Sequence, residues 1–375
     1  MHVDKREEML IDRKKKSWIN SLKGIAICGV VMVHSGVLNL SFPLGRLGAG
    51  GAYGVYVFFV ISAYLAYVSL EHFFCEKKIS ITNMLCWWQR KFVRLIPVFY
   101  LVLLITLLFA NGNDYWLGSQ EKVSIWNIIS HALFLHGLFP HYANSIIGVE
   151  WYLGVLAIFY AIVPFIYKHV NSHKKAWVMF AVSFAGCEVI NQIAFRILPQ
   201  NIQDGYIYQS YVEALWIFEQ VPSLCLGIVL YYFLKSSKVS RVKVYQLILV
   251  ILCSCIFILG RAFGILQHSL LINYTLCAVC TMCIVLILNS HKCVVIDNLL
   301  WSTLGCYSYP IYLLHCFILS LYDKYINLDV GNVFLNWGIK YLIVIAVSLI
   351  VSVLVTRFFD EPIQKLCKNK MDGKN

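Results

Sequence analysis

The chain has 375 residues, of which 60% are hydrophobic and only 13% are charged. A soluble domain carries about 25% charged residues, so this chain has too few charged groups to cover a water-facing surface. Soluble, disordered and fibrous proteins are therefore excluded. Lys and Arg outnumber Asp and Glu by 31 to 19, which is typical of membrane proteins whose basic loops face anionic lipid. The bases are scattered between apolar stretches, so membrane lipid is an expected partner and nucleic acid is not.

The chain opens with a basic segment, 1–17, followed by an apolar run that is too long for a signal peptide and lacks a convincing cleavage site. We interpret this run as a retained first helix. A membrane span needs about 20 mostly apolar residues. Ten stretches qualify: 18–40, 52–70, 95–110, 151–167, 176–198, 212–234, 244–260, 269–289, 299–321 and 337–359. We predict an all-α polytopic membrane protein with about ten transmembrane helices in one domain, 18–362, and a basic cytoplasmic tail, 363–375.

An eleventh apolar stretch, 126–139, is short and carries His131 and His136. As a helix it would reach only about 20 Å, against a hydrocarbon core of about 30 Å. If it does not span, every basic connection falls on one side of the membrane, as the positive-inside rule favours. We therefore predict ten spans with both termini cytoplasmic, and whether 126–139 is re-entrant stays open.

Fourteen cysteines occur, mostly inside apolar stretches, and they indicate no disulfide framework. Cys277, Cys280 and Cys283 recur every three residues along one predicted helix. A metal cluster would fit that spacing, but small buried cysteines are the commoner case. We predict no metal site.

Ionisable residues within spans are costly and are functional candidates. Lys23 and His34 lie eleven residues apart, which places both side chains on one helix face about 16 Å apart. Lys23 is near the cytoplasmic end, where it either binds an anion or only snorkels to the interface. His34 lies too deep for snorkelling. It is either a structural histidine or an acid–base catalyst, since a neutral imidazole accepts a proton near pH 7.

Two further motifs and a polar patch stand out. Arg90, Lys91 and Arg94 precede Pro97 at a cytoplasmic helix entry, where they suit the phosphates of a soluble anionic donor or of lipid. A polar stripe occupies positions i, i+4 and i+7 of one span: Ser308, Tyr312 and His315. Interhelical hydrogen bonds explain such a stripe equally well. Six polar residues either line a cavity or pair with neighbours: Glu188, Asn191, Gln192, Arg196, Glu213 and Glu219.

Taken in order, these segments resemble the membrane acyltransferase 3 family, the bacterial O-acyltransferases of surface glycans. The resemblance runs from residue 18 to 362. It is carried by five motifs: Lys23-x10-His34, the run from Gly54 to Ala63, Arg90-Lys91-x-x-Arg94 with Pro97, Ser308-Tyr309-x-x-Tyr312-Leu313-x-His315, and Asp360-Glu361-Pro362.

The resemblance implies transfer of an acyl group, typically acetyl, from acyl-CoA to a hydroxyl of a surface polysaccharide or its lipid-linked precursor. The acyl-CoA is a co-substrate, and no bound cofactor is implied. The implied place is the bacterial inner (cytoplasmic) membrane, and the partners are acyl-CoA and a glycan acceptor. The implied roles are His34 as base, Lys23, Arg90, Lys91 and Arg94 as donor-binding cations, and five substrate-binding residues: Ser62, Trp151, Ser308, Tyr312 and His315.

Three positions depart from the family pattern. Lys23 replaces an Arg, and an ammonium cannot make the same bidentate contact with a phosphate. Leu156 stands where the family's Trp-x-Leu-x-x-Glu pattern has its Glu, and Ala63 replaces a Gly. Glu150 is near in sequence but about 120° away on the helix. The missing Glu keeps a second function class open, a polysaccharide exporter or flippase-like protein of the same superfamily.

Overall fold

The computed structural model describes residues 17–75, 77–109, 123–197, 205–236, 243–291, 293–326 and 328–371. These residues form helices and no β-strand. Eight helices are long and apolar enough to cross a membrane, and two bent pairs of helices bring the number to ten. The prediction of an all-α multi-pass membrane protein is confirmed. The basic residues 1–16 and the last four residues of the tail lie outside the described ranges, so the domain limits there stay predictions.

Each of the ten predicted stretches overlaps one long helix or one bent pair. The long helices are α2 (Ser17–His34), α4 (Gly54–Phe74), α8 (Trp151–His169), α9 (His173–Ile197), α11 (Ile217–Lys235), α12 (Val244–Ala262), α13 (Leu270–Ser290) and α16 (Val333–Val355). The bent pairs are α5 (Ile81–Phe92) with α6 (Ile96–Phe109), and α14 (Leu299–Cys306) with α15 (Ser308–Tyr325). Short helices complete the fold: η1 (Val37–Asn39), α3 (Leu44–Ala49), η2 (Gly50–Tyr53), α7 (Ile125–Ala132), η3 (His136–Leu138), α10 (Gly205–Ser210), η4 (Tyr211–Leu215), η6 (Thr356–Asp360) and α17 (Glu361–Met371).

The two bends, of 48° and 74°, each precede a proline. Each proline lies in the first turn of the second helix of its pair, Pro97 in α6 and Pro310 in α15. A proline has no N–H to donate to the carbonyl four residues earlier, so it fits the start of a helix and not its continuation. At the sharper bend, the hydroxyl of Ser308 donates to the carbonyl of Gly305 over 2.9 Å and satisfies a group that the helix end leaves open. The α14–α15 bend redirects the chain and sets the path of α15.

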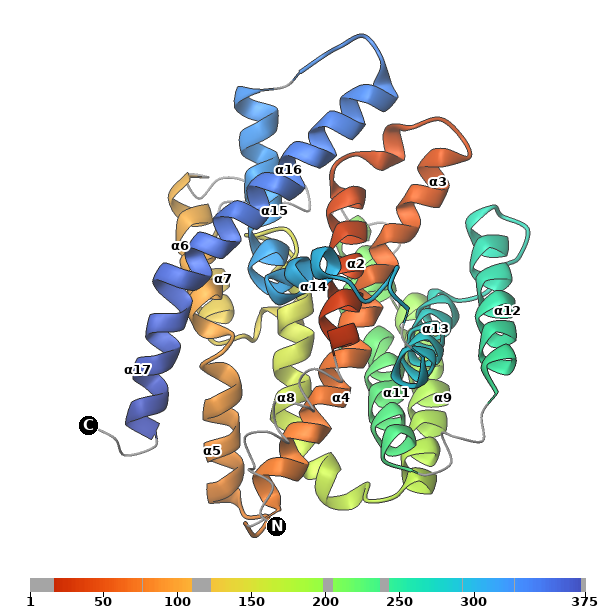
Figure 1. Ribbon diagram of the computed structural model, residues 1–375, viewed down its shortest axis with the longest axis vertical. Coiled ribbons are helices and arrows are strands. Elements are labelled where there is room, and N and C mark those ends of the chain that lie inside the picture. The colour runs from red at the N-terminus through yellow and green to blue at the C-terminus, as the bar shows by residue number, and fades with distance from the viewer. Residues whose placement is uncertain are drawn as a thin grey trace.

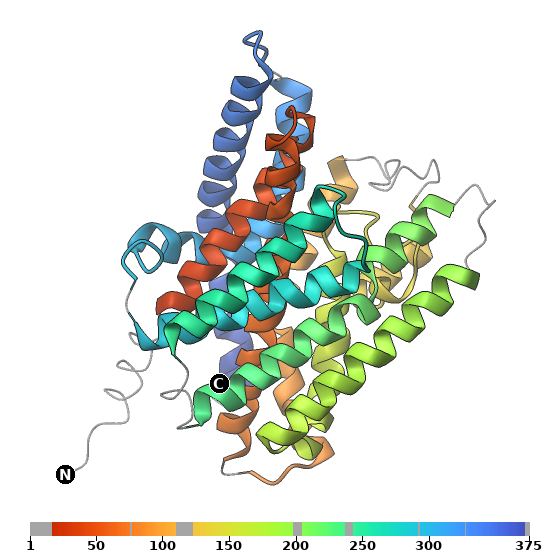
Figure 2. The same cartoon turned by 90° about the vertical axis from the view of Figure 1, so that its right-hand side faces the viewer.

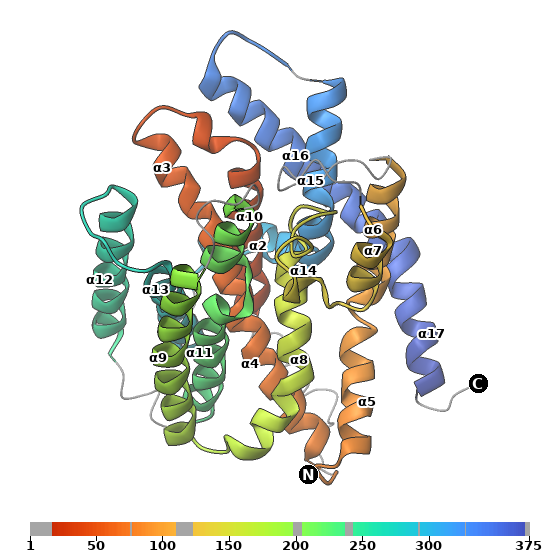
Figure 3. The same ribbon diagram turned by 180° about the vertical axis from the view of Figure 1, so that it is seen from behind.

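The apolar stretch 126–139 does not form a span. Its helix α7 has eight residues, about 12 Å of helix, and it is followed by the single turn η3. Both lie beside α6 and the start of α8 (Figure 3). This arrangement supports the prediction that the basic connections share one side of the membrane.

Helices α2 and α14 pack backbone against backbone. A Cβ atom at Gly24 would overlap the carbonyl oxygen of Trp301, and one at Gly305 would overlap that of Asn20. Small residues allow this close approach, as they do between other membrane helices. Because α15 follows directly on α14, the contact also determines where α15 lies relative to α2.

The long axis of the molecule runs from the α4–α5 turn, near α17, to the α15–α16 turn (Figures 1 and 2). The α16–η6–α17 segment, Val333–Met371, has 39 residues. Such a rod is about 58 Å long, whereas the hydrocarbon core is about 30 Å thick. At least one end of this rod therefore extends beyond the core.

Candidate active site

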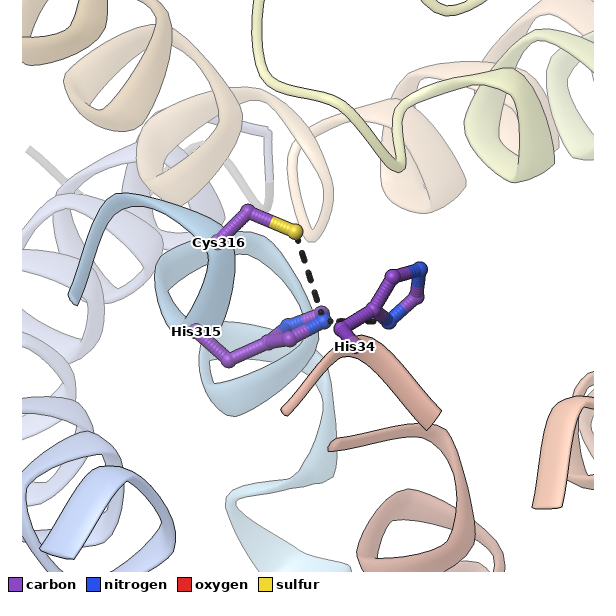
Figure 4. Close-up of side chains that lie close together, drawn as sticks. All are labelled: His34, His315 and Cys316. Atoms are coloured by element: carbon purple, nitrogen blue, oxygen red, sulfur yellow. Dashed lines mark hydrogen bonds between the residues drawn. The ribbon is translucent and has the colours of Figure 1, made fainter. Parts of the chain in front are cut away.

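His34 and His315 meet where the end of α2 lies against α15, and His34 is exposed there. His34 is the last residue of α2, and His315 lies in the middle of α15 and is fully buried. The Nε2 atom of His315 is 3.0 Å from Nδ1 of His34, as Figure 4 shows. The thiol of Cys316 lies 3.5 Å from the same Nε2 atom. Three chemically active side chains from two distant parts of the sequence thus share one site.

The neighbouring carbonyl groups define the tautomers of both rings. Nδ1 of His315 is 3.2 Å from the carbonyl oxygen of Ile311. A carbonyl can only accept, so Nδ1 of His315 carries the proton and its Nε2 is an acceptor. Nδ1 of His34 faces that acceptor and the carbonyl of Val30 at 3.1 Å, so it carries a proton too. The neutral His34 therefore holds its lone pair on Nε2, which points away from His315 (Figure 4) and is free to act as a base.

His34 borders two cavities. One, of about 360 Å³, lies between α2, α3, α4, α12 and α13 and is mostly apolar. Its aromatic wall consists of Tyr53, Tyr56, Trp151, Tyr274 and Tyr312. The other cavity, of about 440 Å³, follows α15 away from His34 past Ser320, Asp323 and Lys324. A substrate can reach His34 from an apolar side and from a polar side.

The predicted substrate-binding residues fall into three groups. Trp151 and Tyr312 line the apolar cavity beside His34, and His315 supports the His34 ring. Ser62 does not line the apolar cavity; its hydroxyl is 3.1 Å from the hydroxyl of Tyr152. The Tyr152 ring lies 5.5 Å from that of Tyr312, so Ser62 connects to the site through tyrosines. Ser308 instead bonds within its own bend.

The predicted donor-binding cations lie on the other side of Ser62 from His34. The charge of Lys91 is repelled by those of Arg94 and Lys23, so all three cations share one region. The ammonium of Lys91 lies 5.6 Å from the centre of the Tyr160 ring. Tyr160 in turn interacts with Ser62 and with the charge of Arg94. A path of polar and aromatic side chains thus leads from the cations towards His34.

A groove of about 350 Å³ between the end of α5 and α17 contains the remaining cation, Arg90. Arg90 also stacks on Phe73, 5.5 Å from its ring centre. The other residues of the groove are Val93, Arg94, Glu361, Gln364, Lys365, Lys368 and Met371. The sequence analysis did not assign Lys365 and Lys368 to this region, because nothing in the spacing of the helices shows that the tail returns to α5.

A buried acidic turn lies ahead of α8, and the sequence did not predict its hydrogen bonds. Glu150 is fully buried, and its carboxylate accepts four backbone N–H groups at 2.7–3.1 Å, from Ile146, Ile147, Gly148 and Val149. The His131 ring is 3.2 Å from the same carboxylate. Burial disfavours the charged form, but the bond from His131 and these N–H groups hold the pKa of Glu150 below its ordinary value.

This turn forms part of the site. The hydroxyl of Tyr312 donates to the carbonyl of Val149 over 2.5 Å, and Trp151 follows directly in the chain. His136 stacks on His131 with ring centres 4.3 Å apart and faces the carbonyl of Glu150. The sequence carried one signal for this group: His131, His136 and Glu150 are ionisable residues in a short apolar region. A buried charge needs a partner, so these three residues could have been expected to pair.

Other polar residues noted in the sequence pair among themselves. Asn191 donates to Glu219 over 2.7 Å, and Glu188 accepts from Ser269 and Gln192. Among the described residues, the one group of three candidate metal ligands is His34, His315 and Cys316. Cys277, Cys280 and Cys283 form no such group there. One side-chain oxygen each of Asn191 and Glu219 has no hydrogen-bond partner among the described residues, and Ala214 of the same region lines the apolar cavity beside His34.

The fold and the site together define a multi-pass helical membrane protein with a pair of histidines at the junction of two cavities. Residues 16–357 match the acyltransferase domain of the acyltransferase 3 family, and the chain belongs to this family, as its motifs predicted. The chain is 26% identical over 377 residues to a protein named peptidoglycan O-acetyltransferase OatA from Listeria monocytogenes. That match covers 94% of this chain but only 56% of the relative. No solved structure matches the chain.

Proposed function

We propose that this protein is a membrane O-acyltransferase that moves an acetyl group from acetyl-CoA to a hydroxyl of a bacterial surface polysaccharide or of its lipid-linked precursor. Membership of an acyltransferase family supports the class of reaction. The name of the Listeria relative supports an acetyl group and a glycan acceptor. The proposed place is the bacterial cytoplasmic membrane, with both termini on the cytoplasmic side.

The observation that carries the proposal is the contact between His34 and His315, from which we infer that the Nε2 atom of His34 is unprotonated. In the proposed reaction, this nitrogen takes the proton of the acceptor hydroxyl while the hydroxyl oxygen attacks the carbonyl carbon of the thioester. The new C–O bond forms, the C–S bond breaks, and the proton passes from His34 to the departing CoA sulfur. His315 holds the Nδ1 proton in place throughout and stabilises the imidazolium that forms on the way.

The charge distribution supports a donor that enters beside Lys23, Lys91 and Arg94. The phosphates of CoA are anions, and these cations lie in one region. Lys23 and His34 are separated by eleven residues of α2, about 16 Å along the axis. The extended arm of CoA then follows the tyrosines near Ser62, and its thioester lies at the His34 end. Holding both substrates against one base supplies much of the rate.

The test measures acetyl transfer from radiolabelled acetyl-CoA in purified membranes that contain wild-type protein, His34→Ala or His291→Ala at matched expression. We expect label in alkali-labile glycan ester for the wild type and for His291→Ala, whose histidine is exposed beyond the end of α13. His34→Ala should lose about 10²–10⁴-fold in rate.

Transfer by His34→Ala at the wild-type rate would overturn the role of His34. Absence of label from every membrane, with acetyl-CoA and then with succinyl-CoA, would overturn the proposed function. That result would favour the alternative, a polysaccharide exporter. Transporters often contain broken helices, and this chain has two bent helix pairs.

A further inference from the structure

A second polar cavity, of about 350 Å³, lies beyond His34 at the α15–α16 end of the molecule. Its wall is formed by the segment after α2, the end of α15 and the start of α16, and it includes Tyr322, Asp323, Asp329, Asn336, Trp337 and Lys340. Asp323 also lines the polar cavity that contains His34. The two cavities therefore meet at one side chain, and neither includes a donor-binding cation.

Tyr322 and Trp337 point to a missing ligand. Tyr322 is 97% buried, at 3% exposure, yet its hydroxyl has no hydrogen-bond partner among the described residues. The indole N–H of Trp337 has none either. A buried polar group without a partner costs about 1–3 kcal/mol, and native structures rarely leave such groups unexplained. Two of them in the wall of one cavity are explained if a ligand oxygen bonds to each.

The rest of the cavity has the chemistry that binds sugars. The Trp337 ring stacks on Tyr341 at 5.9 Å, which holds a flat apolar surface in place. Lys340 bonds to both carboxylate oxygens of Asp323, at 2.6 and 2.9 Å. Asn336 donates to Asp329 over 2.7 Å. Such an aromatic surface beside fixed donors and acceptors suits the apolar face and the hydroxyls of a sugar ring.

Charge and position narrow the class of ligand. Asp323 and Asp329 carry two negative charges against the one positive charge of Lys340, so the cavity does not attract a polyanion such as CoA. It lies at the end of the long axis opposite α17 and the α4–α5 turn (Figures 1 and 2). Tyr322 follows His315 by seven residues, which places both on one face of α15 about 10 Å apart. A chain bound at Tyr322 is thus in line with His34.

We propose that the cavity around Tyr322 and Trp337 binds the acceptor glycan and directs one of its hydroxyls along α15 to His34. This inference rests on the proposed function and extends it by giving the glycan its own site, separate from that of the donor. The uncharged or weakly charged part of a glycan chain lies on Trp337. Tyr322 and the indole N–H donate to its oxygens.

The test compares Tyr322→Phe and Trp337→Phe with two matched controls, Tyr325→Phe and Trp126→Phe, whose rings are 71% and 69% exposed. The ligand is the surface glycan of the bacterium that makes this protein, after mild alkali has removed its esters. Its binding to purified protein is measured by calorimetry, and acetyl transfer to it is measured by label. We expect both site variants to weaken glycan binding and raise the KM for glycan about tenfold. The KM for acetyl-CoA and the two controls should not change.

The outcomes separate this inference from the proposed function. Site variants that bind the glycan as tightly as the wild type would overturn the inference even if transfer occurs. A wild type that transfers no acetyl group but binds the glycan through Tyr322 and Trp337 would overturn the proposed function and leave the glycan site standing. A wild type that does not bind the glycan would overturn the inference directly.

Discussion

In the proposed reaction, His315 determines which nitrogen of His34 acts as the base. Because the carbonyl of Ile311 keeps a proton on Nδ1 of His315, the Nε2 atom of His315 must accept from His34. The lone pair of His34 is thereby directed into the cavities and away from its neighbour. His315 is a positioning residue, since it touches the base and not the reacting atoms.

We expect His315→Leu to lower kcat about 10- to 100-fold, which is part of the 10²–10⁴-fold contribution of a general base. The KM for acetyl-CoA should stay unchanged, because the donor-binding cations lie elsewhere. His315→Gln should recover part of the rate, since its amide oxygen can accept from Nδ1 of His34. Steady-state kinetics with acetyl-CoA and saponified glycan provide the measurement.

Equal rates for the Leu and Gln variants would contradict this role. A rise in the KM for acetyl-CoA together with the fall in kcat would point to a structural defect. Thermal denaturation of both variants in detergent serves as the control for folding.

The sequence marks His34 and His315 as polar residues in apolar spans, but it does not show that they touch. They are 281 positions apart, and helical periodicity describes faces of one helix, not the pairing of two. Glu150 was noticed in the sequence and set aside because its angle on the helix differs from that of Leu156. In the structure the Glu150 carboxylate turns back onto the backbone of residues 146–149, a contact that its angle on the helix does not predict.

At the scale of elements, the turn before α8 depends on a buried group of His131, His136 and Glu150. Burial, and then the neighbouring His131, lower the pKa of His136 to about 4. Its ordinary value is 6.5. Below pH 6.5 the unfolded chain therefore binds a proton that the folded chain does not, so the stability of the fold declines as the pH falls from 6.5 towards 4.

His136→Gln should make the fold less sensitive to acid. A glutamine N–H can still donate to the carbonyl of Glu150, but it does not titrate. We expect the wild-type Tm in detergent to fall between pH 6.5 and 4.5 by more than that of the variant, with a difference in stability on the order of 2–3 kcal/mol. Parallel declines for the two proteins would refute the role of His136. His291→Gln, at an exposed position, is the matched control.

The elements themselves were largely predictable. Ten apolar stretches of sufficient length correspond to ten helices or bent pairs. This is expected, because a helix must be apolar over about 20 residues to be stable in the hydrocarbon core. The bends were not predicted, although Pro97 and Pro310 were visible, because a proline also fits the first turn of an unbroken helix. The place of α17 beside α5 also went unpredicted, since contacts between distant helices leave no periodic signal.

At the scale of the whole molecule, cations line the groove between the end of α5 and α17, whereas the Tyr322 cavity lies between the end of α15 and the start of α16. The α15–α16 turn forms one end of the long axis, away from α17 (Figure 1). If both proposed sites are correct, the two substrates do not compete for one entrance and meet only near His34. A change at one end should then affect the KM of one substrate alone.

We expect the double variant Lys365→Gln, Lys368→Gln to raise the KM for acetyl-CoA about fivefold, because two exposed charges near phosphates contribute about 1 kcal/mol together. The KM for glycan should not change. Salt screens exposed charges, so the difference from the wild type should shrink when transfer is measured in 0.5 M KCl. Lys370→Gln, on the same helix but outside the groove, is the control. A similar effect of that control, or a difference that persists in high salt, would argue against phosphate binding by α17.

The glycine contact between α2 and α14 has a consequence for recognising active members among distant sequences. Gly24 and Gly305 touch no substrate, yet a single methyl group at either one would separate α2 from α14. His315 is carried by the helix that continues from α14, so the separation would pass on to the 3.0 Å bond between His34 and His315. A chain that keeps every polar residue of the site but has a larger residue at 24 or 305 would look intact in a motif search and still be misassembled. Two residues without side chains are thus as diagnostic of the site as the histidines themselves.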